Sequence, residues 1–156
     1  RAFYELAERE AVRARRTNLP VSILVIDADE FKAVNDRCGH AVGDLVLRRF
    51  ASELVPLLRE GDVLARWGGE EFLLLLSVSD VVQASQALER LRQHVESLAV
   101  LLPDGQTLRF TVSFGLTDYR TPEEGSEAVA RADTALYQAK AQGRDRAVAA
   151  ALFNPI

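Results

Sequence analysis

The sequence VSILVIDAD, residues 21–29, decides the fold class, because an apolar run leads directly into two aspartates. Residues 21–26 are rich in β-branched side chains, which is typical of a strand buried on both faces of a sheet. A buried strand that ends in carboxylates indicates a site at its C-terminal end. Side chains alternate along a strand, so Asp27 and Asp29 point the same way only if the strand continues through both; a turn at Ala28 would splay them apart.

The flanking sequence predicts an alternation of helices and strands with one hairpin in the middle. Apolar residues repeat at helical spacing in three segments, and Thr121, Pro122 and Glu124 resemble a capping box that opens a fourth helix. A polar turn is expected around Gly39, His40 and Gly43. The expected helices cover residues 1–17, 46–54, 82–98 and 121–143, and the further strands cover 63–67, 72–78, 110–116 and 146–150.

The predicted hairpin carries acids at its tip, where Gly68 and Gly69 are followed by Glu70 and Glu71. If the hairpin lies beside the first strand, Glu70 comes within reach of Asp27, and the two carboxylates offer the hard oxygen ligands that Mg²⁺ or Mn²⁺ prefers. Because Mg²⁺ often completes its coordination with waters and substrate phosphates, such a cluster predicts a phosphate-bearing substrate. The alternative is that these acids are solvated loop residues.

Composition narrows the class of protein further. The chain has 156 residues, of which 48% are hydrophobic, so one domain over residues 1–156 is expected. A net charge of -4 gives no global basic field for nucleic acid or an anionic membrane surface. The single cysteine, Cys38, forms no internal disulfide, and no signal segment is seen, which favours the cytoplasm. The longest apolar runs are too short to span a membrane.

Four blocks of sequence resemble the GGDEF family of diguanylate cyclases. Residues 68–72 match the family signature in its GGEEF form, and residues 27–44 match D-x-D-x-F-K-x-x-N-D-x-x-G-H-x-x-G-D. Residues 111–115 match T-x-S-x-G, and residues 132–144 match A-D-x-A-L-Y-x-A-K-x-x-G-R. The blocks occur in order and at the expected spacing over nearly the whole chain.

This resemblance implies an α/β fold of the α+β palm-like type, with a central, mainly antiparallel sheet flanked by helices, similar to the palms of nucleotide cyclases and polymerases. It also implies condensation of two GTP into cyclic di-GMP and two pyrophosphates, with two Mg²⁺ or Mn²⁺ ions per half-site, across a homodimer. The domain would then be a fragment of a larger sensor protein whose upstream sensor is absent from this chain.

The family motifs also imply roles for individual residues. The metals would be held by Asp27, the carbonyl of Ala28 and Glu70, with Asp29 in support and Glu71 as a base or outer partner. GTP would be bound by Phe31, Lys32, Asn35, His40, Asp44, Gly68, Gly69, Lys140 and Arg144. Within that set Asn35 and Asp44 would read the guanine edge, because a carboxylate accepts from donors that adenine lacks.

An R-x-x-D pair, Arg59 and Asp62, precedes the glycine turn by five residues. In the family this is the position of an inhibitory cyclic di-GMP site, and Arg90 is a plausible helper; the alternative is an ordinary surface ion pair. Two rival functions stay open, a catalytically silent receptor for GTP or cyclic di-GMP and a cyclase that uses ATP. One departure from the family pattern is Asp145, where G-R-N-R appears as Gly-Arg-Asp-Arg.

Overall fold

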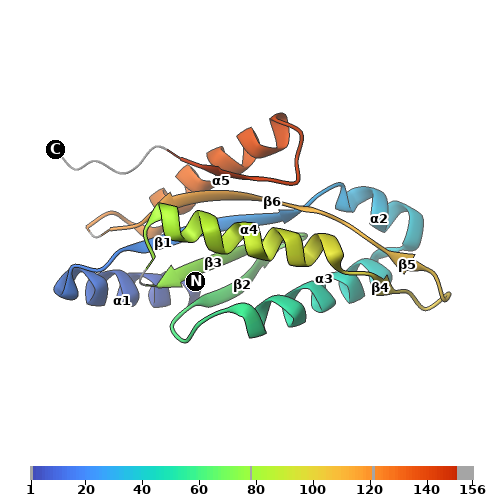
Figure 1. The fold of residues 1–156 in the computed structure, drawn as a ribbon, viewed down its shortest axis with the longest axis horizontal. Coiled ribbons are helices and arrows are strands. Elements are labelled where there is room, and N and C mark those ends of the chain that lie inside the picture. Colours follow the sequence, from blue (N-terminus) through green and yellow to red (C-terminus); the bar gives the residue numbers. More distant parts are fainter. Residues whose placement is uncertain (1, 78, 121, 151–156) are drawn as a thin grey trace.

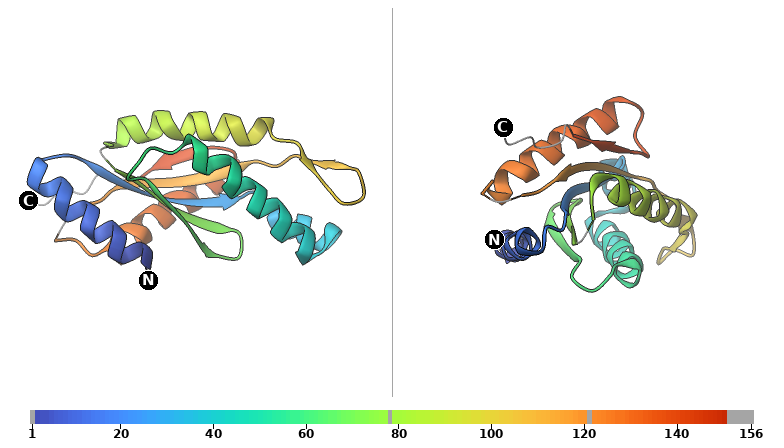
Figure 2. Two further views of the ribbon diagram at one scale, coloured as in Figure 1. Left: turned by 90° about the horizontal axis from the view of Figure 1, so that it is seen from below. Right: turned by 60° about the vertical axis from the view of Figure 1, so that its left-hand side comes forward.

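The chain forms one five-stranded sheet with helices on both faces (Figures 1 and 2). The computed structural model describes residues 2–77, 79–120 and 122–150. The helices are α1 (Ala2–Thr17), α2 (Phe31–Cys38), α3 (His40–Leu54), the short 3-10 helix η1 (Val55–Leu57), α4 (Val81–Ser97) and α5 (Gly125–Ala141). The strands are β1 (Val21–Ala28), β2 (Val63–Gly68), β3 (Glu71–Ser77), β4 (Val100–Leu101), β5 (Thr107–Leu108), β6 (Val112–Asp118) and β7 (Ala147–Ala149).

Strand β1 occupies the centre of the sheet, in the order β2-β3-β1-β6-β7. It pairs antiparallel with β3 and with β6, and β2 pairs antiparallel with β3, whereas β6 and β7 are parallel. The expected mainly antiparallel sheet is therefore confirmed. The register sets Asp27 opposite Glu71 on β3 and opposite Ser113 on β6. The end of β1 therefore lies beside the first residue of β3, next to the glycine turn.

The apolar side chains of β1 pack into two cores, one on each face of the sheet. Leu24 and Ile26 pack in a cluster with side chains of α3 and α4, such as Phe50 and Leu88. Residues 23 and 25 alternate to the other face, where they pack with α1 and α5. Because both faces of β1 are covered, its strand is buried along its whole length, as a two-sided apolar sequence requires.

Helix α5 approaches the sheet closely because β6 contains a glycine at the crossing. A Cβ built on Gly115 would lie 1.9 Å from the carbonyl oxygen of Ala132. This close packing fixes the course of α5 over the sheet. The last turn of that helix, with Lys140, consequently lies at the end of β1.

Residues 39–43 form no loop, in contrast to the expected polar turn. Helix α2 ends at Cys38, Gly39 adopts φ 88°, and α3 begins at once at His40. Phe31 and Val34 are buried against the core, and Gly43 lies inside α3. The two glycines suggested a turn, but only Gly39 needs the backbone freedom of glycine, while Gly43 serves close packing.

The start of α5 was also placed too early. The helix begins at Gly125 with Glu124 as N-cap and no capping side-chain hydrogen bond; Thr121 lies outside the described residues, as does Val78 at the end of the predicted third strand. The capping box that the structure does contain joins Asp80 and Gln83 at α4. The short ribbon β4–β5 was not predicted, since two-residue strands carry no periodic signal. Within the described ranges, no helix is both long and apolar enough to cross a membrane.

Candidate active site

Asp27 lies at the C-terminal end of β1, at the centre of the site, and only 3% of its surface is exposed. Its Oδ2 accepts a hydrogen bond from the ammonium of Lys140 on α5. Its Oδ1 is buried and has no hydrogen-bond partner among the described residues. Burial raises the pKa of Asp27, and the Lys140 hydrogen bond acts in the opposite direction. A buried carboxylate with a free oxygen is a ready ligand for a cation.

Asp29 is held differently, because the strand ends at Ala28. Its two carboxylate oxygens accept hydrogen bonds from Thr111 Oγ1 at 2.7 Å, Ser113 Oγ at 2.7 Å and the backbone N–H of Asp145 at 3.0 Å. Its own N–H donates to the carbonyl of Thr111 at 2.9 Å. Asp29 is thus fixed to β6 and to the turn after α5, and its charge raises the pKa of Asp27.

The glycine hairpin brings further acids to Asp27. The backbone N–H of Ala28 donates to the carbonyl of Glu70 at 3.4 Å, which joins the hairpin tip to the end of β1. Burial and then the charge of Asp27 raise the pKa of Glu70. Burial, Asp27 and Asp133 raise the pKa of Glu71. The carboxylates of Asp27, Glu70 and Glu71 therefore interact electrostatically with one another, and the charge of Lys140 acts on all three.

The glycines leave the hairpin tip open. A Cβ added at Gly68 or at Gly69 would meet no atom within 4 Å, and Gly69 has φ 36°. The register between β2 and β3 also shifts between Arg66 and Gly68, which bends the tip. A ligand can approach the backbone here without meeting side chains.

The oxygen atoms at the end of β1 and on the hairpin tip suit a hard divalent cation, although the side chains are not gathered into a complete metal-binding group. In the part of the chain that the structure describes, no three His, Cys, Asp or Glu side chains are gathered as ligands. The free Oδ1 of Asp27, the carbonyl of Ala28 and the carboxylate of Glu70 are oxygen donors at one strand end. Oxygen ligands completed by water and phosphate are the usual surroundings of Mg²⁺, so these residues fit it.

The N-terminus of α2 follows Asp29 after one residue. Glu30, its N-cap, has a left-handed φ of 54° and makes no capping side-chain hydrogen bond. The first turn of α2, with buried Phe31 and exposed Lys32, consequently presents uncapped backbone N–H groups. Such a helix end attracts anions.

Asn35 of α2 packs against α3 at Gly43, the residue that precedes Asp44. A Cβ on Gly43 would lie 1.9 Å from Asn35 Oδ1, so the amide of Asn35 rests directly against the backbone of α3 beside Asp44. Asp44 Oδ1 accepts a hydrogen bond from Arg66 Nη2 at 3.1 Å. The same Arg66 nitrogen donates to the carbonyl of Gly69 at 2.9 Å. Arg66 therefore ties Asp44 to the glycine hairpin.

Two other predicted GTP-binding residues lie at helix ends. His40 is the exposed first residue of α3. Arg144 follows α5 in a left-handed conformation with φ 62°, and its N–H donates to the carbonyl of Ala139 at 3.0 Å. Arg144 lines a shallow cavity that also includes Asp29 and Glu30, at the start of α2.

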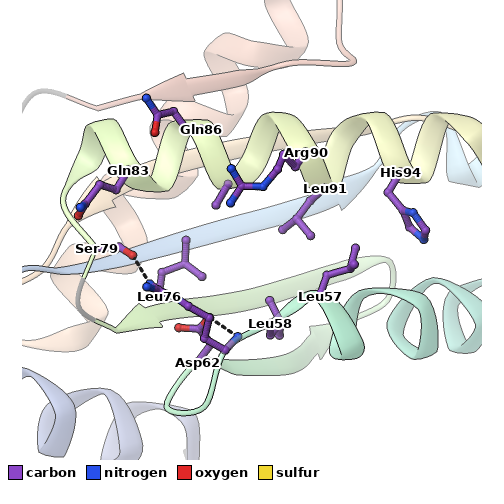
Figure 3. Close-up of a pocket in the computed structure, with 12 residues that line it drawn as sticks. Leu57, Leu58, Asp62, Leu76, Ser79, Gln83, Gln86, Arg90, Leu91 and His94 are labelled. Carbon is purple, nitrogen blue, oxygen red and sulfur yellow. Dashed lines mark hydrogen bonds and ion pairs between the residues drawn. The ribbon is translucent and has the colours of Figure 1, made fainter.

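A separate cavity of about 400 Å³ contains the three predicted inhibitory residues, Arg59, Asp62 and Arg90. Figure 3 shows Arg90, Leu91 and His94 along α4, across from Leu57, Leu58 and Asp62. The cavity wall is therefore partly apolar and partly cationic.

The two members of the R-x-x-D pair differ in exposure. The Arg59 side chain is 61% exposed and donates from Nη2 to Ser77 O at 2.9 Å and to Ser79 Oγ at 2.7 Å. The side chain of Asp62 is only 3% exposed, and it accepts from the backbone N–H groups of Arg59 at 2.9 Å and Ser77 at 3.0 Å. Asp62 thus shapes the turn that presents Arg59.

Sequence reasoning assigned no separate role to Arg66 and included Asp133 only as part of a family motif. Asp133 acts electrostatically on Asp27 and Glu71, and its spacing of seven residues from Lys140 placed both on one face of a helix. Arg66 precedes the glycine pair on β2, but a partner on α3 is not visible in sequence spacing.

A central antiparallel sheet, with acids at the end of its middle strand and on the neighbouring glycine turn, defines a palm-like domain. The family model described as "Diguanylate cyclase, GGDEF domain" matches residues 1–146. The chain belongs to this GGDEF family of diguanylate cyclases.

Individual relatives agree with this assignment. The chain is 41% identical to diguanylate cyclase DgcP of Pseudomonas aeruginosa over 145 residues, which cover 93% of this chain and 22% of that protein. It is similar to diguanylate cyclase SiaD of the same species, solved in complex with its activator SiaC, with TM-score 0.90 and 43% identity over 96% of this chain and 57% of the other. The GGDEF domain of DgcB from Caulobacter crescentus, solved with cyclic di-GMP, gives TM-score 0.87 and 33% identity over 95% and 85%.

Proposed function

We propose that this chain is a catalytic domain that joins two GTP molecules into cyclic di-GMP. The observation that carries the proposal is the convergence of Asp27, Glu70 and Glu71 around Lys140, at the end of the central strand and beside an open glycine turn. The chain spans 22% to 36% of the length of several curated relatives, so we further propose that it is one domain of a longer signalling protein.

The proposed metal ligands are Asp27 through Oδ1, the carbonyl of Ala28 and the carboxylate of Glu70. Two Mg²⁺ or Mn²⁺ ions, when bound, would supply neutralisation of the triphosphate and a lower pKa for the attacking hydroxyl. The ammonium of Lys140, which contacts Asp27 Oδ2, is then close enough to exchange that carboxylate for a phosphate oxygen.

The phosphates and the base would be held on either side of this centre. The uncapped first turn of α2 at Phe31 and Lys32, together with Arg144, suits the β- and γ-phosphates. Asn35 and Asp44 would bind the guanine edge, because N1 and the exocyclic amine of guanine both donate and a carboxylate accepts both. Arg66 would orient Asp44 for this contact.

In each half-reaction the 3′-oxygen of one GTP would form a bond to the α-phosphorus of the other, and the bond from that phosphorus to the bridging oxygen of pyrophosphate would break. Glu71 would take up the hydroxyl proton, since burial and neighbouring acids raise its pKa and a carboxylate of higher pKa is a stronger base. One domain offers one such site, so two domains must face each other for both bonds to form.

The cavity with Arg59 and Arg90 would bind cyclic di-GMP as an inhibitor. Arginine suits such a ligand, because its planar group binds phosphate and stacks on guanine. The same cavity also favours one rival function, a receptor that binds cyclic di-GMP and catalyses nothing.

A nucleotide assay separates these functions. The purified chain is mixed with Mg²⁺ and either GTP or ATP, and pyrophosphate and cyclic di-GMP are measured. We expect product from GTP only, and a loss of roughly 100-fold or more in Asp27→Asn and Glu70→Gln, because each substitution removes a charged ligand. Glu127→Gln is the matched control, since this exposed acid lies about 20 Å along α5 from Lys140.

Two outcomes would reject the cyclase proposal. Equal product from ATP would remove the guanine-reading role of Asn35 and Asp44. No product at high protein concentration, together with tight binding of cyclic di-GMP, would assign the chain to the receptor class.

A further inference from the structure

The turn that joins α5 to β7 has an unusual backbone. Gly143, Arg144 and Asp145 all have positive φ, at 118°, 62° and 48°. Left-handed backbone at two successive non-glycine residues costs on the order of 1 kcal/mol or more at each, although Asp tolerates it better than most residues. Such a turn persists only where surrounding contacts hold it.

Asp145 makes contacts in two directions. Its backbone N–H donates to Asp29 Oδ2 at 3.0 Å, and its carboxylate Oδ1 accepts from Arg92 Nη1 at 3.0 Å. One residue therefore joins helix α4 to the carboxylate that lies two positions beyond Asp27. Arg144, a proposed phosphate ligand, lies in the same turn.

Arg92 is oriented by its own helix toward this turn. Its side chain is 17% exposed, and it also pairs with Glu89 at 2.6 Å and with Glu96 at 2.9 Å. Those two acids are on α4 and are each more than half exposed, whereas Asp145 comes from another element and is 33% exposed. The Asp145 pair is thus the better shielded of the three and the one that links separate parts of the fold.

We propose that Arg92 and Asp145 are positioning residues for the catalytic site. Their ion pair holds the turn at 143–146, which keeps the Asp145 N–H on Asp29 and keeps Arg144 beside the start of α2. Without this support the carboxylate of Asp29 loses one of its three hydrogen-bond donors, the backbone N–H of Asp145, and its charge is free to move relative to Asp27. Small displacements of this kind cost catalysis heavily, because a reaction between bound groups depends on their alignment. The catalytic part of this inference rests on the proposed function.

The chain offers a conservative variant that tests the role of Asp145. Asn also tolerates left-handed backbone, and its side-chain oxygen can still accept from Arg92. Asp145→Asn should therefore retain the turn, whereas Asp145→Ala should not. Arg92→Gln removes the same pair from the other side. Glu96→Gln is the matched control, because it removes another partner of Arg92 without touching the turn.

The experiment uses the full chain and two readouts. Amide hydrogen exchange at Asp145 reports the turn directly, and calorimetry with a non-hydrolysable GTP analogue and Mg²⁺ reports the site. We expect Arg92→Gln and Asp145→Ala to exchange this amide about tenfold faster and to weaken analogue binding about five- to tenfold, with Tm lowered by only a few degrees. Asp145→Asn and Glu96→Gln should stay within about threefold of the unmodified chain. The double variant should be no weaker than the weaker single variant, since both remove one interaction.

Unchanged exchange of the Asp145 amide in Arg92→Gln would overturn the inference, whatever happens to activity. Equal effects from Glu96→Gln and Arg92→Gln would also overturn it, because loss of surface charge on α4 would then be the cause. If the unmodified chain neither binds the analogue nor turns over GTP, the proposed function fails instead, and the exchange comparison still decides whether Arg92 holds the turn.

Discussion

Asp27 illustrates how a single residue is kept for chemistry at a cost in stability. One of its oxygens is matched by Lys140, and the other is buried without a partner among the described residues. A buried acceptor left unsatisfied costs about 1 to 3 kcal/mol, more when it is charged. Unfavourable arrangements of this kind concentrate at functional sites, where a ligand supplies the missing interaction.

Glu71 shows a second cost of the site, the burial of neighbouring carboxylates, which can be measured through the pH dependence of stability. Burial and the charges of Asp27, Asp133 and Glu70 raise its pKa, so the fold holds the proton more tightly than the unfolded chain does. Its contribution to stability is complete below the ordinary pKa of Glu and is lost as pH rises through the raised pKa. Once it is ionised, the group therefore destabilises the metal-free fold.

We expect Glu71→Gln to raise the Tm of the metal-free chain at pH 7 by about 1 to 3 °C and to flatten the fall of Tm between pH 5 and 7. Thermal unfolding followed by circular dichroism at several pH values measures both effects. Glu127→Gln, at an exposed position on α5, is the control. A lower Tm in Glu71→Gln than in the unmodified chain would contradict the electrostatic account.

At the scale of elements, the helix pair α2 and α3 forms the part of the site that we propose binds the base. Gly39 ends α2 and allows the chain to turn directly into α3. Gly43, one turn into α3, leaves the space that the Asn35 amide occupies. The position of a proposed base-reading side chain therefore depends on how two helices pack.

Gly43→Ala tests this dependence. The added Cβ would lie 1.9 Å from Asn35 Oδ1 and 3.2 Å from Phe31 Cε2, so the Asn35 side chain must move. Alanine is the better helix former by about 1 kcal/mol, which offsets part of any strain. We expect KM for GTP to rise about tenfold or more while the helix pair stays folded, as steady-state kinetics and circular dichroism would show. Arg48→Ala, at an exposed position of α3, is the control, and an unchanged KM in Gly43→Ala would separate Asn35 from base binding.

The sequence predicted the central strand and the hairpin, because alternation and apolar runs are local signals. That the hairpin lies beside the central strand was only a condition at that point, and the pairing of β1 with β3 meets it. It also predicted which carboxylates lie at the strand end. It missed α2 and the direct entry into α3, because Gly39, His40 and Gly43 have the composition of a turn. The partners of Arg66, Arg92 and Asp145 were out of reach, since each pair joins residues more than 20 positions apart with no periodic pattern between them.

At the scale of the whole molecule, the proposed active site and the proposed inhibitory cavity lie near opposite ends of strand β3. The glycine turn precedes β3 at Glu71, whereas the cavity that contains Arg59 is lined by Leu76 and Ser79 at the other end of that strand. Seven residues of extended chain span about 20 Å. Under the proposed function, we therefore expect a ligand in the cavity and a nucleotide at the glycine turn to bind one domain at the same time.

We expect Arg59→Ala to raise the cyclic di-GMP concentration for half-inhibition, measured against the uninhibited rate of the same variant, by about tenfold or more. Arg59 supplies an exposed guanidinium to the cavity, and its loss removes a charge-assisted contact to phosphate. Pyrophosphate release at increasing cyclic di-GMP measures the change. Glu60→Ala, at the next residue, is the control, and unchanged inhibition in Arg59→Ala would remove this cavity as the inhibitory site.

The separation of the two sites along β3 also determines how inhibition by cyclic di-GMP should depend on the GTP concentration. If the inhibitor binds at the Arg59 cavity and GTP at the glycine turn, as we propose, the two do not compete for the same atoms and a surplus of GTP should not displace the inhibitor. Cyclic di-GMP should lower the maximal velocity and leave the half-saturating GTP concentration nearly constant. The fraction of activity that a given concentration of product removes would then be the same in nucleotide-rich and nucleotide-poor cells.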